Sequence, residues 1–251
     1  MGIFEASMLM LAGVAAGTMN TVVGAGSLVT FPVMLAFGYA PLAANMTNNV
    51  GVLPGGLSGI YALRSDLAHQ WPRALRLSVF SLVGGTAGAL LLLALPAAAF
   101  KSIVPVLVGL AVVLVIIQPW LRERVTRRNR MSKVHAALGD SAIFMTGIYG
   151  GYFGAAQGVL LMSILGAMFD ETIQKINSIK MVLGMSANLA ATAVFIVRGG
   201  VVWEAAGAIA FGSIIGGQLG AHIGRRLPAN VYRAVIVAVG VIAIIKIVST
   251  Q

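Results

Sequence analysis

Residues 13–32 read GVAAGTMNTVVGAGSLVTFP, an apolar stretch interrupted by a glycine-rich break at positions 24–27. The apolar segment before the break covers about residues 5–23, and a short one after it covers about residues 28–38. A segment of that length makes a helix of roughly 16 Å, about half of the ~30 Å hydrocarbon core of a bilayer. The stretch therefore predicts a broken membrane helix, which either turns back as a hairpin or completes one crossing after the break.

The composition places the chain in a membrane. Of its 251 residues, 59% are hydrophobic and only 10% are charged, whereas soluble domains carry about 25% charged residues. This shortage of charge excludes a cytosolic enzyme, a secreted domain and a disordered chain. The 17 Lys and Arg residues exceed the 7 Asp and Glu residues, and in a membrane protein this excess indicates cytoplasmic loops rather than nucleic-acid binding. The absence of cysteine excludes disulfides, thiolate metal sites and iron–sulfur ligation.

Apolar segments separated by short charged or Pro- and Gly-rich breaks run the length of the chain. They cover about residues 5–23, 28–38, 42–63, 74–95, 98–119, 139–153, 158–169, 176–197, 203–224 and 228–248. The long polar break at 121–135 is strongly basic, and we expect a cytoplasmic linker there. It separates a first transmembrane repeat, residues 1–120, from a second, residues 136–251.

Three motifs recur in the two halves, and all three matches agree on nearly the same register. The matching pairs are Gly17-x6-Gly24 with Gly147-x6-Gly154, residues 83–89 with 215–221, and residues 95–97 with 227–229. Their agreement indicates a true internal repeat, which is typical of secondary transporters. The mid-helix glycines of the second motif have the spacing of helix–helix packing contacts. By the same argument, residues 139–169 form a second broken pair.

The positive-inside rule separates two arrangements of the repeats. If each broken pair is a hairpin, the repeats are inverted, and 14 basic residues lie inside against 3 outside. If each pair crosses once, the repeats are parallel and the counts become 11 and 6. The inverted arrangement is the better interpretation. It predicts an all-α polytopic membrane protein of two inverted repeats, each a broken-helix hairpin plus three transmembrane helices, with both termini non-cytoplasmic.

The two glycine-rich breaks are candidate ligand sites. Irregular backbone at membrane depth is tolerated only where it lines protein or a watery cavity, and helix N-termini facing such a break can bind anions. The glycines could instead be close packing contacts. The candidate binding residues at the breaks are Asn20, Thr21, Gly24, Gly26, Ser27, Tyr149, Gly154, Gln157 and Gly158.

A second polar cluster opens the helix that follows each broken pair. Polar side chains there are costly in lipid unless they face protein or water, although some could cap the helix. Lys180 lies about one turn inside its helix, where it could face a cavity as the counter-charge of an anion or reach the cytoplasmic surface. The candidate binding residues of this cluster are Asn45, Asn48, Asn49, Asn177, Ser178 and Lys180.

The remaining ionisable groups suggest no catalytic chemistry. His222 is a lone histidine that could couple protons but is interpreted as structural, and Asp140 is interpreted as a helix N-cap. The sequence shows no mid-span carboxylate, no metal-ligand spacing and no Ser/His/Asp arrangement. Gly24-x-Gly26 lacks the third glycine and the strand–turn–helix context of a dinucleotide site. We therefore expect no cofactor, no metal and no enzymatic activity.

The motif Gly13-x3-Gly17-x6-Gly24-x-Gly26-Ser-Leu-x3-Pro32, followed by an Asn- and Thr-rich helix start, resembles the TauE/SafE sulfite exporter family. The resemblance covers essentially the whole chain. In the second half, Ala155-Ala156-Gln157 replaces the glycine run of that family, and Ser163 stands at its proline position. The resemblance implies an exporter of small sulfur oxyanions or organosulfonates in the cell inner membrane.

Together, the residues and the resemblance predict a secondary transporter that exports a small anion by alternating access. The anion, sulfite or an organosulfonate, would bind between the two breaks and the polar helix starts. An anion channel, or a carrier of a non-sulfur anion such as a carboxylate, is the alternative. The expected partners are the anionic substrate and the lipid bilayer, without nucleic acid, and the oligomeric state is left open.

Overall fold

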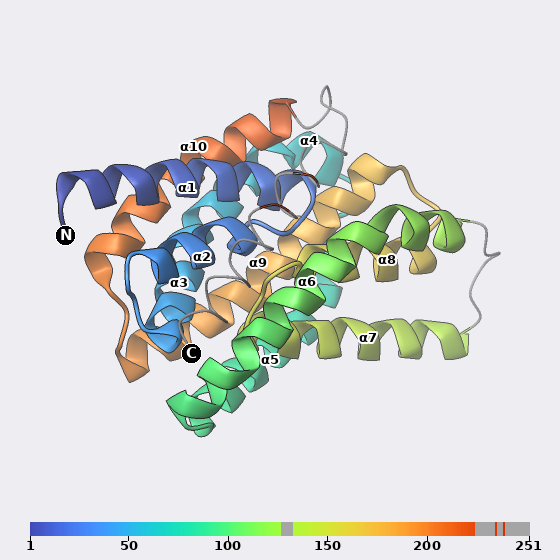
Figure 1. Ribbon diagram of the computed structural model, residues 1–251. Helices are drawn as coiled ribbons and strands as arrows, with labels where there is room; N and C mark the ends of the chain where they lie inside the picture. The colour runs from blue at the N-terminus through green and yellow to red at the C-terminus, as the bar shows by residue number, and fades with distance from the viewer. Residues whose placement is uncertain (127–132, 224–233, 235–237, 239–251) are drawn as a thin grey trace.

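The computed structural model describes residues 1–126, 133–223, 234 and 238, and the elements assigned within this part are all helices (Figure 1). They are α1 (Ile3–Val22), α2 (Ser27–Ala36), α3 (Pro41–Ala62), α4 (Arg64–Leu67), α5 (Trp71–Ala94), α6 (Ala97–Thr126), α7 (Lys133–Tyr152), α8 (Gln157–Met168), α9 (Ile173–Arg198) and α10 (Trp203–Ile223). Their ends lie close to those of the predicted segments, except that α6 and α7 extend further toward each other. The short α4 was not predicted, and segment 228–248 lies almost wholly outside the described residues.

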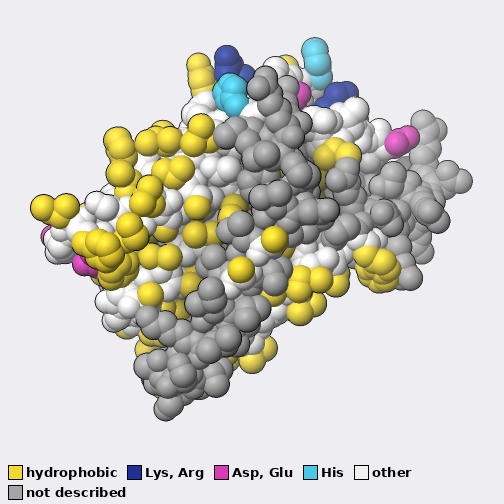
Figure 2. All heavy atoms as spheres, turned by 45° about the horizontal axis from the view of Figure 1, so that its top comes forward, with side chains coloured by type: hydrophobic (Ala, Val, Ile, Leu, Met, Phe, Trp, Pro, Cys, Tyr) yellow, Lys and Arg dark blue, Asp and Glu magenta, His cyan; other side chains and the backbone are white. Residues whose placement is uncertain are grey.

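Several helices are long and apolar enough to cross a membrane. Among the described residues these are α1, α5, α6 over Ala97–Gln118, and α9. α2 and α8 are the short apolar helices expected after each break, with 10 and 12 residues. Large apolar side chains such as Val79 and Val106 face outward, and Figure 2 shows hydrophobic side chains spread across the visible face. The chain is therefore an all-α polytopic membrane protein.

Glycines allow these helices to approach at backbone distance. A Cβ atom added at Gly88 of α5 would lie 2.0 Å from the carbonyl oxygen of Ile148 in α7. One added at Gly216 of α10 would lie 2.1 Å from the carbonyl oxygen of Val14 in α1. α1 packs most extensively against α10, and α5 against α7. The predicted packing role of the mid-helix glycines is confirmed, because only hydrogen fits at these contacts.

Helices of each half take their main packing partners from the other half, and they do so in repeat-equivalent pairs. In the sequence repeat α1 corresponds to α7, and α5 to α10, so the α1–α10 and α5–α7 contacts are equivalent. α3 and α9 also correspond, and they cross antiparallel. Gly59 near the end of α3 lies against Met181 near the start of α9, whereas Asn49 earlier in α3 is bonded by Thr192 later in α9. These opposed directions support the inverted arrangement, which stays a prediction.

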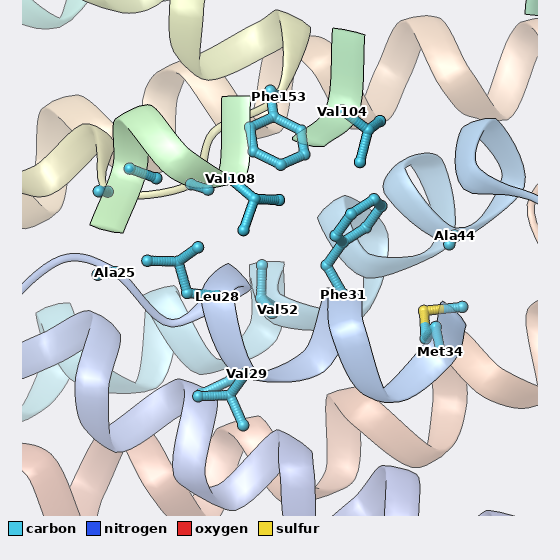
Figure 3. Packing of buried hydrophobic residues seen from close by; sticks show 14 of the residues in the cluster. Ala25, Leu28, Val29, Phe31, Met34, Ala44, Val52, Val104, Val108 and Phe153 are labelled. Atoms are coloured by element: carbon cyan, nitrogen blue, oxygen red, sulfur yellow. The ribbon is translucent and has the colours of Figure 1, made fainter. Parts of the chain in front are cut away.

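The two broken pairs share one apolar core. Phe31 of α2 meets Phe153, which follows the end of α7, edge-on with the ring centroids 5.3 Å apart. Figure 3 shows the two rings close together, with Val104 and Val108 of α6 beside them. Burying each ring stabilises the fold by about 1.5–3 kcal/mol. Phe31 thus packs α2 against the second broken pair.

Ion pairs join helices that come from different halves of the chain. At the starts of α1 and α10, the N-terminal ammonium group lies 3.0 Å from Glu204. Near the starts of α5 and α7, Arg76 donates to Asp140 at 2.7 Å. The N-cap interpretation of Asp140 is wrong, since α7 begins at Lys133 and the carboxylate pairs with a residue distant in sequence. Figure 2 shows Lys, Arg and His side chains gathered at one edge of the visible face.

Candidate functional site

The two breaks have the same backbone turn at equivalent positions. Gly24 has φ +85°, and its repeat equivalent, Gly154, has φ +75°. Each glycine N–H donates back to the carbonyl oxygen five residues earlier, Gly24 to Met19 at 2.9 Å and Gly154 to Tyr149 at 3.0 Å. A positive φ is strained for residues with a side chain, so glycine is required at both turns. The helix ends there, and the chain starts α2 or α8 after a few residues.

The two breaks touch each other. The backbone N–H of Gly158 donates to the carbonyl oxygen of Gly24 at 3.0 Å. A Cβ atom added at Gly24 would lie 2.4 Å from the Cα of Gly158, and one added at Gly158 would lie 2.4 Å from the Cα of Gly24. This contact brings together two segments that are far apart in sequence. It therefore places residues of the first break next to residues of the second.

A small cavity lies beside this contact, between α1, α3, α8 and α9. Its volume is ≈30 Å³, which is room for roughly two water-sized groups. Among the described residues it is lined by Asn20, Gly24, Ser27, Gly56, Gly154, Gln157, Gly158, Lys180, Met181, Gly184, Met185 and Asn188. Seven of these lining residues are among those that the sequence singled out, from both breaks and from the second cluster.

Lys180 is the cationic side chain of the cavity lining. It is only 2% exposed, and its Nζ donates to the carbonyl oxygens of Asn20 at 3.1 Å and Thr21 at 3.4 Å. These carbonyls belong to the last turn of α1, where backbone acceptors have no partner within the helix and the helix dipole is negative. Lys180 forms no salt bridge with any described residue. The structure thus favours the cavity over the membrane surface for this ammonium group.

Gln157 adds a buried polar group that has no partner. Its side chain is 3% exposed, and its Nε2 forms no hydrogen bond within the described part of the chain. The amide lies over Gly150, where an added Cβ would come within 2.3 Å of Nε2. A buried N–H donor without an acceptor costs about 1–3 kcal/mol. Gln157 therefore supplies a donor that a ligand in the cavity could satisfy.

Two candidate asparagines lie outside the cavity lining, where they cap the broken helices of the opposite half. Asn45 of α3 donates from Nδ2 to the carbonyl oxygen of Tyr152 at the end of α7, at 3.0 Å. Asn177 of α9 donates from Nδ2 to the carbonyl oxygen of Thr21 near the end of α1, at 3.1 Å. Asn45 and Asn177 occupy equivalent positions in the internal repeat. They satisfy C-terminal carbonyls that the helix itself leaves unpaired.

The other candidates are bonded within or between helices. Asn48 accepts a hydrogen bond from Thr30, and Asn49 accepts one from Thr192 at 2.9 Å. The remaining hydroxyls bond nearby backbone carbonyls: Ser178 to Lys175 (2.8 Å), Thr21 to Gly17 (3.0 Å) and Tyr149 to Ala155 (2.5 Å). Gly26 packs against α1, because a Cβ there would lie 2.2 Å from the carbonyl oxygen of Ala16. These contacts support the breaks without lining the cavity.

Sequence reasoning missed Asn188 and its neighbours in the lining. Lys180, Gly184 and Asn188 are four residues apart in α9, so they lie on one helix face, and all three line the cavity. That spacing was a usable signal. Gly56, another missed residue, is the equivalent of Asn188 in the register of the internal repeat. Nothing in the sequence distinguishes Met181 and Met185 from ordinary apolar core residues.

Several ionisable groups outside the cavity have partners in the structure. His222 is exposed, and its Nδ1 lies 2.9 Å from the carbonyl oxygen of Gln218, as expected for a structural histidine. In the loop before α9, the hydrogen bond from Lys175 keeps the pKa of Glu171 below its ordinary value, with further bonds from Gln70 and Arg73. No group of three metal-ligating side chains occurs among the described residues.

Comparison with known proteins gives a consistent picture. A probable membrane transporter protein of Haemophilus influenzae is 26% identical over 254 residues, which cover 100% of this chain and 97% of the relative. The probable membrane transporter protein YfcA of Escherichia coli K12 is 27% identical over 221 residues, covering 88% and 79%. A further probable membrane transporter protein, from a Sinorhizobium species, is 26% identical over 247 residues, covering 97% and 92%. The model of the family described as sulfite exporter TauE/SafE matches residues 9–247. Because this match covers nearly the whole chain, the protein belongs to the TauE/SafE sulfite exporter family.

Proposed function

We propose that this chain is a secondary transporter that exports a small anion, sulfite or an organosulfonate, by alternating access. The anion binds in the cavity between the two glycine breaks. The observation that carries the proposal is the buried ammonium of Lys180, which lines this cavity without a carboxylate partner among the described residues. Membership of a family described as sulfite exporters supports the substrate class, and the names of the relatives support transport in general.

The lining offers several donors to an oxyanion. An ammonium group has three N–H donors, and Lys180 uses two of them on α1. The Nε2 of Gln157 is free of other bonds within the described residues, and the cavity lies at the first residues of α2 and α8, Ser27 and Gln157. Helix N-termini present a positive dipole end to an anion, here without the N–H groups of Gln157 and Gly158, which already donate to Gly154 and Gly24. Charge-assisted hydrogen bonds from these groups would replace the hydration shell of a small oxyanion.

The place of the cavity supports a carrier mechanism. The lining combines both breaks, one from each half of the internal repeat, with α3 and α9, which cross antiparallel. In carriers built from repeats, the ligand sits at the repeat interface, and the halves rock around it. We place the starts of α5, α7 and α9 at the cytoplasmic side of the inner membrane, and both termini on the opposite side. The positions of Arg73, Arg76 and Lys175 near those helix starts support this orientation.

Binding of sulfite and methanesulfonate to the purified protein, measured by isothermal titration calorimetry, tests the proposed site. Lys180→Met should weaken binding by roughly 10-fold or more, because a hydrogen bond to a charged group contributes about 1.5–3 kcal/mol. Lys175→Met is the matched control, since it removes a cation from the same helix that pairs with Glu171 outside the cavity lining. Equal affinities in both variants would overturn the site. Tighter binding of acetate than of either sulfur anion would overturn the proposed substrate class.

Transport in proteoliposomes separates a carrier from a channel. Anion trapped inside the vesicles should accelerate uptake of labelled anion, because exchange returns a loaded carrier across the membrane. Flux that neither saturates nor responds to trapped anion would establish a channel and overturn alternating access. The Lys180→Met protein, reconstituted in the same amount, gives the background rate.

A further inference from the structure

We infer that the cavity selects small oxyanions with a single negative charge and rejects dianions of the same shape. This inference rests on the proposed function, since it specifies the substrate of the same site. For organosulfonates it requires the sulfonate monoanion, and for sulfite it requires the singly protonated hydrogensulfite form.

The first step is the charge of the lining. Lys180 is its only cationic side chain within the described residues, and the lining residues include no Asp or Glu. The other polar side chains are the amides of Asn20, Gln157 and Asn188 and the hydroxyl of Ser27. The ion pairs near Lys180 in sequence, formed by Glu171 with Lys175 and Arg73, are made by residues outside the lining. Lys180 is thus the one described lining residue whose side chain can carry a positive charge.

The second step is the electrostatic balance on binding. A buried charge needs a counter-charge, because removing an ion from water costs several kcal/mol unless it is paired. A monoanion beside Lys180 forms a pair with no net charge. A dianion leaves one negative charge that only neutral amides, a hydroxyl and backbone N–H groups can stabilise.

The third step is the arrangement of the donors along α9. Lys180 and Asn188 are two turns apart on the same face and both line the cavity. The Oδ1 of Asn188 would lie 3.9 Å from a Cβ added at Gly154, so this amide lies near the second break. Lys180 instead bonds the end of α1 beside the first break. The cavity therefore has a charged side and a neutral side, and a monoanion can place its charge toward Lys180.

Methanesulfonate and sulfate provide the test, because both are small tetrahedral oxyanions and they differ in charge. Calorimetry at one near-neutral pH should give methanesulfonate an affinity at least about 10-fold above that of sulfate, from the cost of an unpaired buried charge. Sulfate binding as tightly as methanesulfonate, with both lost in Lys180→Met, would overturn the charge selection and leave the proposed site standing. If neither anion binds, or if both bind equally well without Lys180, the proposed function itself fails.

A second charge on the neutral side gives a gain-of-function test. Asn188→Lys should raise the affinity for sulfate relative to methanesulfonate by roughly 10-fold, since the lining would then carry two positive charges. Asn188→Gln is the matched control, because it keeps a neutral amide and should keep the preference for the monoanion. An unchanged affinity ratio in a folded Asn188→Lys protein would contradict the inference. The wild-type comparison of the two anions decides the question if that variant fails to fold.

Discussion

The backbone N–H of Gly158 donates a hydrogen bond of 3.0 Å to the carbonyl oxygen of Gly24 and joins the two helix breaks. A Cβ atom added to either glycine would lie 2.4 Å from the Cα of the other. The contact therefore tolerates only hydrogen on both sides. Because Asn20, Gly24, Ser27, Gly154, Gln157 and Gly158 of the cavity lining belong to the segments that meet here, their relative positions depend on this close approach.

Gly24→Ala should destabilise the protein more than Gly38→Ala does. Both glycines have positive φ, +85° and +88°, so both substitutions incur a backbone strain of about 1–2 kcal/mol. An added Cβ meets nothing within 4 Å at Gly38, but at Gly24 it lies 2.4 Å from the Cα of Gly158. Gly24→Ala should therefore lower the thermal midpoint in detergent more than Gly38→Ala does. The difference between the two midpoints measures the contribution of the contact between the breaks. Equal midpoints for the two variants would show that the breaks can separate without cost.

Asn45→Ala should cost more stability than Asn177→Ala, although the two residues are repeat equivalents. Without Asn45, the carbonyl oxygen of Tyr152 loses the side-chain donor that the structure gives it, at a cost of about 1–3 kcal/mol. Without Asn177, the carbonyl oxygen of Thr21 keeps the ammonium of Lys180 at 3.4 Å. Denaturant unfolding of the two variants in the same detergent measures the difference. A larger loss for Asn177→Ala would contradict this account of the caps.

Part of this site could be predicted from the sequence, because the repeat places equivalent glycines at equivalent turns. Gly24, Gly154 and Gln157 were found in that way, and Lys180 was found from the polar cluster at the start of its helix. Asn45 and Asn177 have the same polarity as cavity residues, but helix rotation turns them toward helix ends, and residue type alone does not encode rotation. Asn188 reads as an isolated polar residue in an apolar helix until the inward direction of Lys180 is known. Asp140 was misread because its partner, Arg76, comes from a different helix.

The loop before α9 gives a prediction about pH. The hydrogen bond from Lys175 keeps the folded-state pKa of Glu171 below its ordinary value of 4.5. A carboxyl group with a lowered folded pKa stabilises the protein above its unfolded pKa, and this contribution is lost as the pH falls through the folded pKa. The thermal midpoint should therefore fall less steeply on acidification below the unfolded pKa in Glu171→Gln than in the wild type. Parallel pH profiles for the two proteins would show that Glu171 has no role in acid sensitivity.

The orientation in the membrane can be tested directly, because the natural chain contains no cysteine. His69 and Arg198 are both exposed and lie just before α5 and at the end of α9. In the proposed orientation, His69→Cys faces the cytoplasm and Arg198→Cys faces the opposite side. A membrane-impermeant maleimide added to intact cells should label only Arg198→Cys, and both should react after lysis. Labelling of His69→Cys in intact cells would reverse the proposed orientation.

The exchange of partners between the halves also has a consequence for synthesis. The main partner of α1 is α10, which the ribosome makes long after α1, so the glycine face of α1 at Gly13 and Gly17 has no permanent neighbour until then. Contacts between segments so distant in sequence form slowly. The first half of the nascent chain therefore stays in the bilayer as inserted but loosely associated helices until α10 is made. Assembly of the binding cavity then becomes a late event in biogenesis, which follows membrane insertion and does not accompany it.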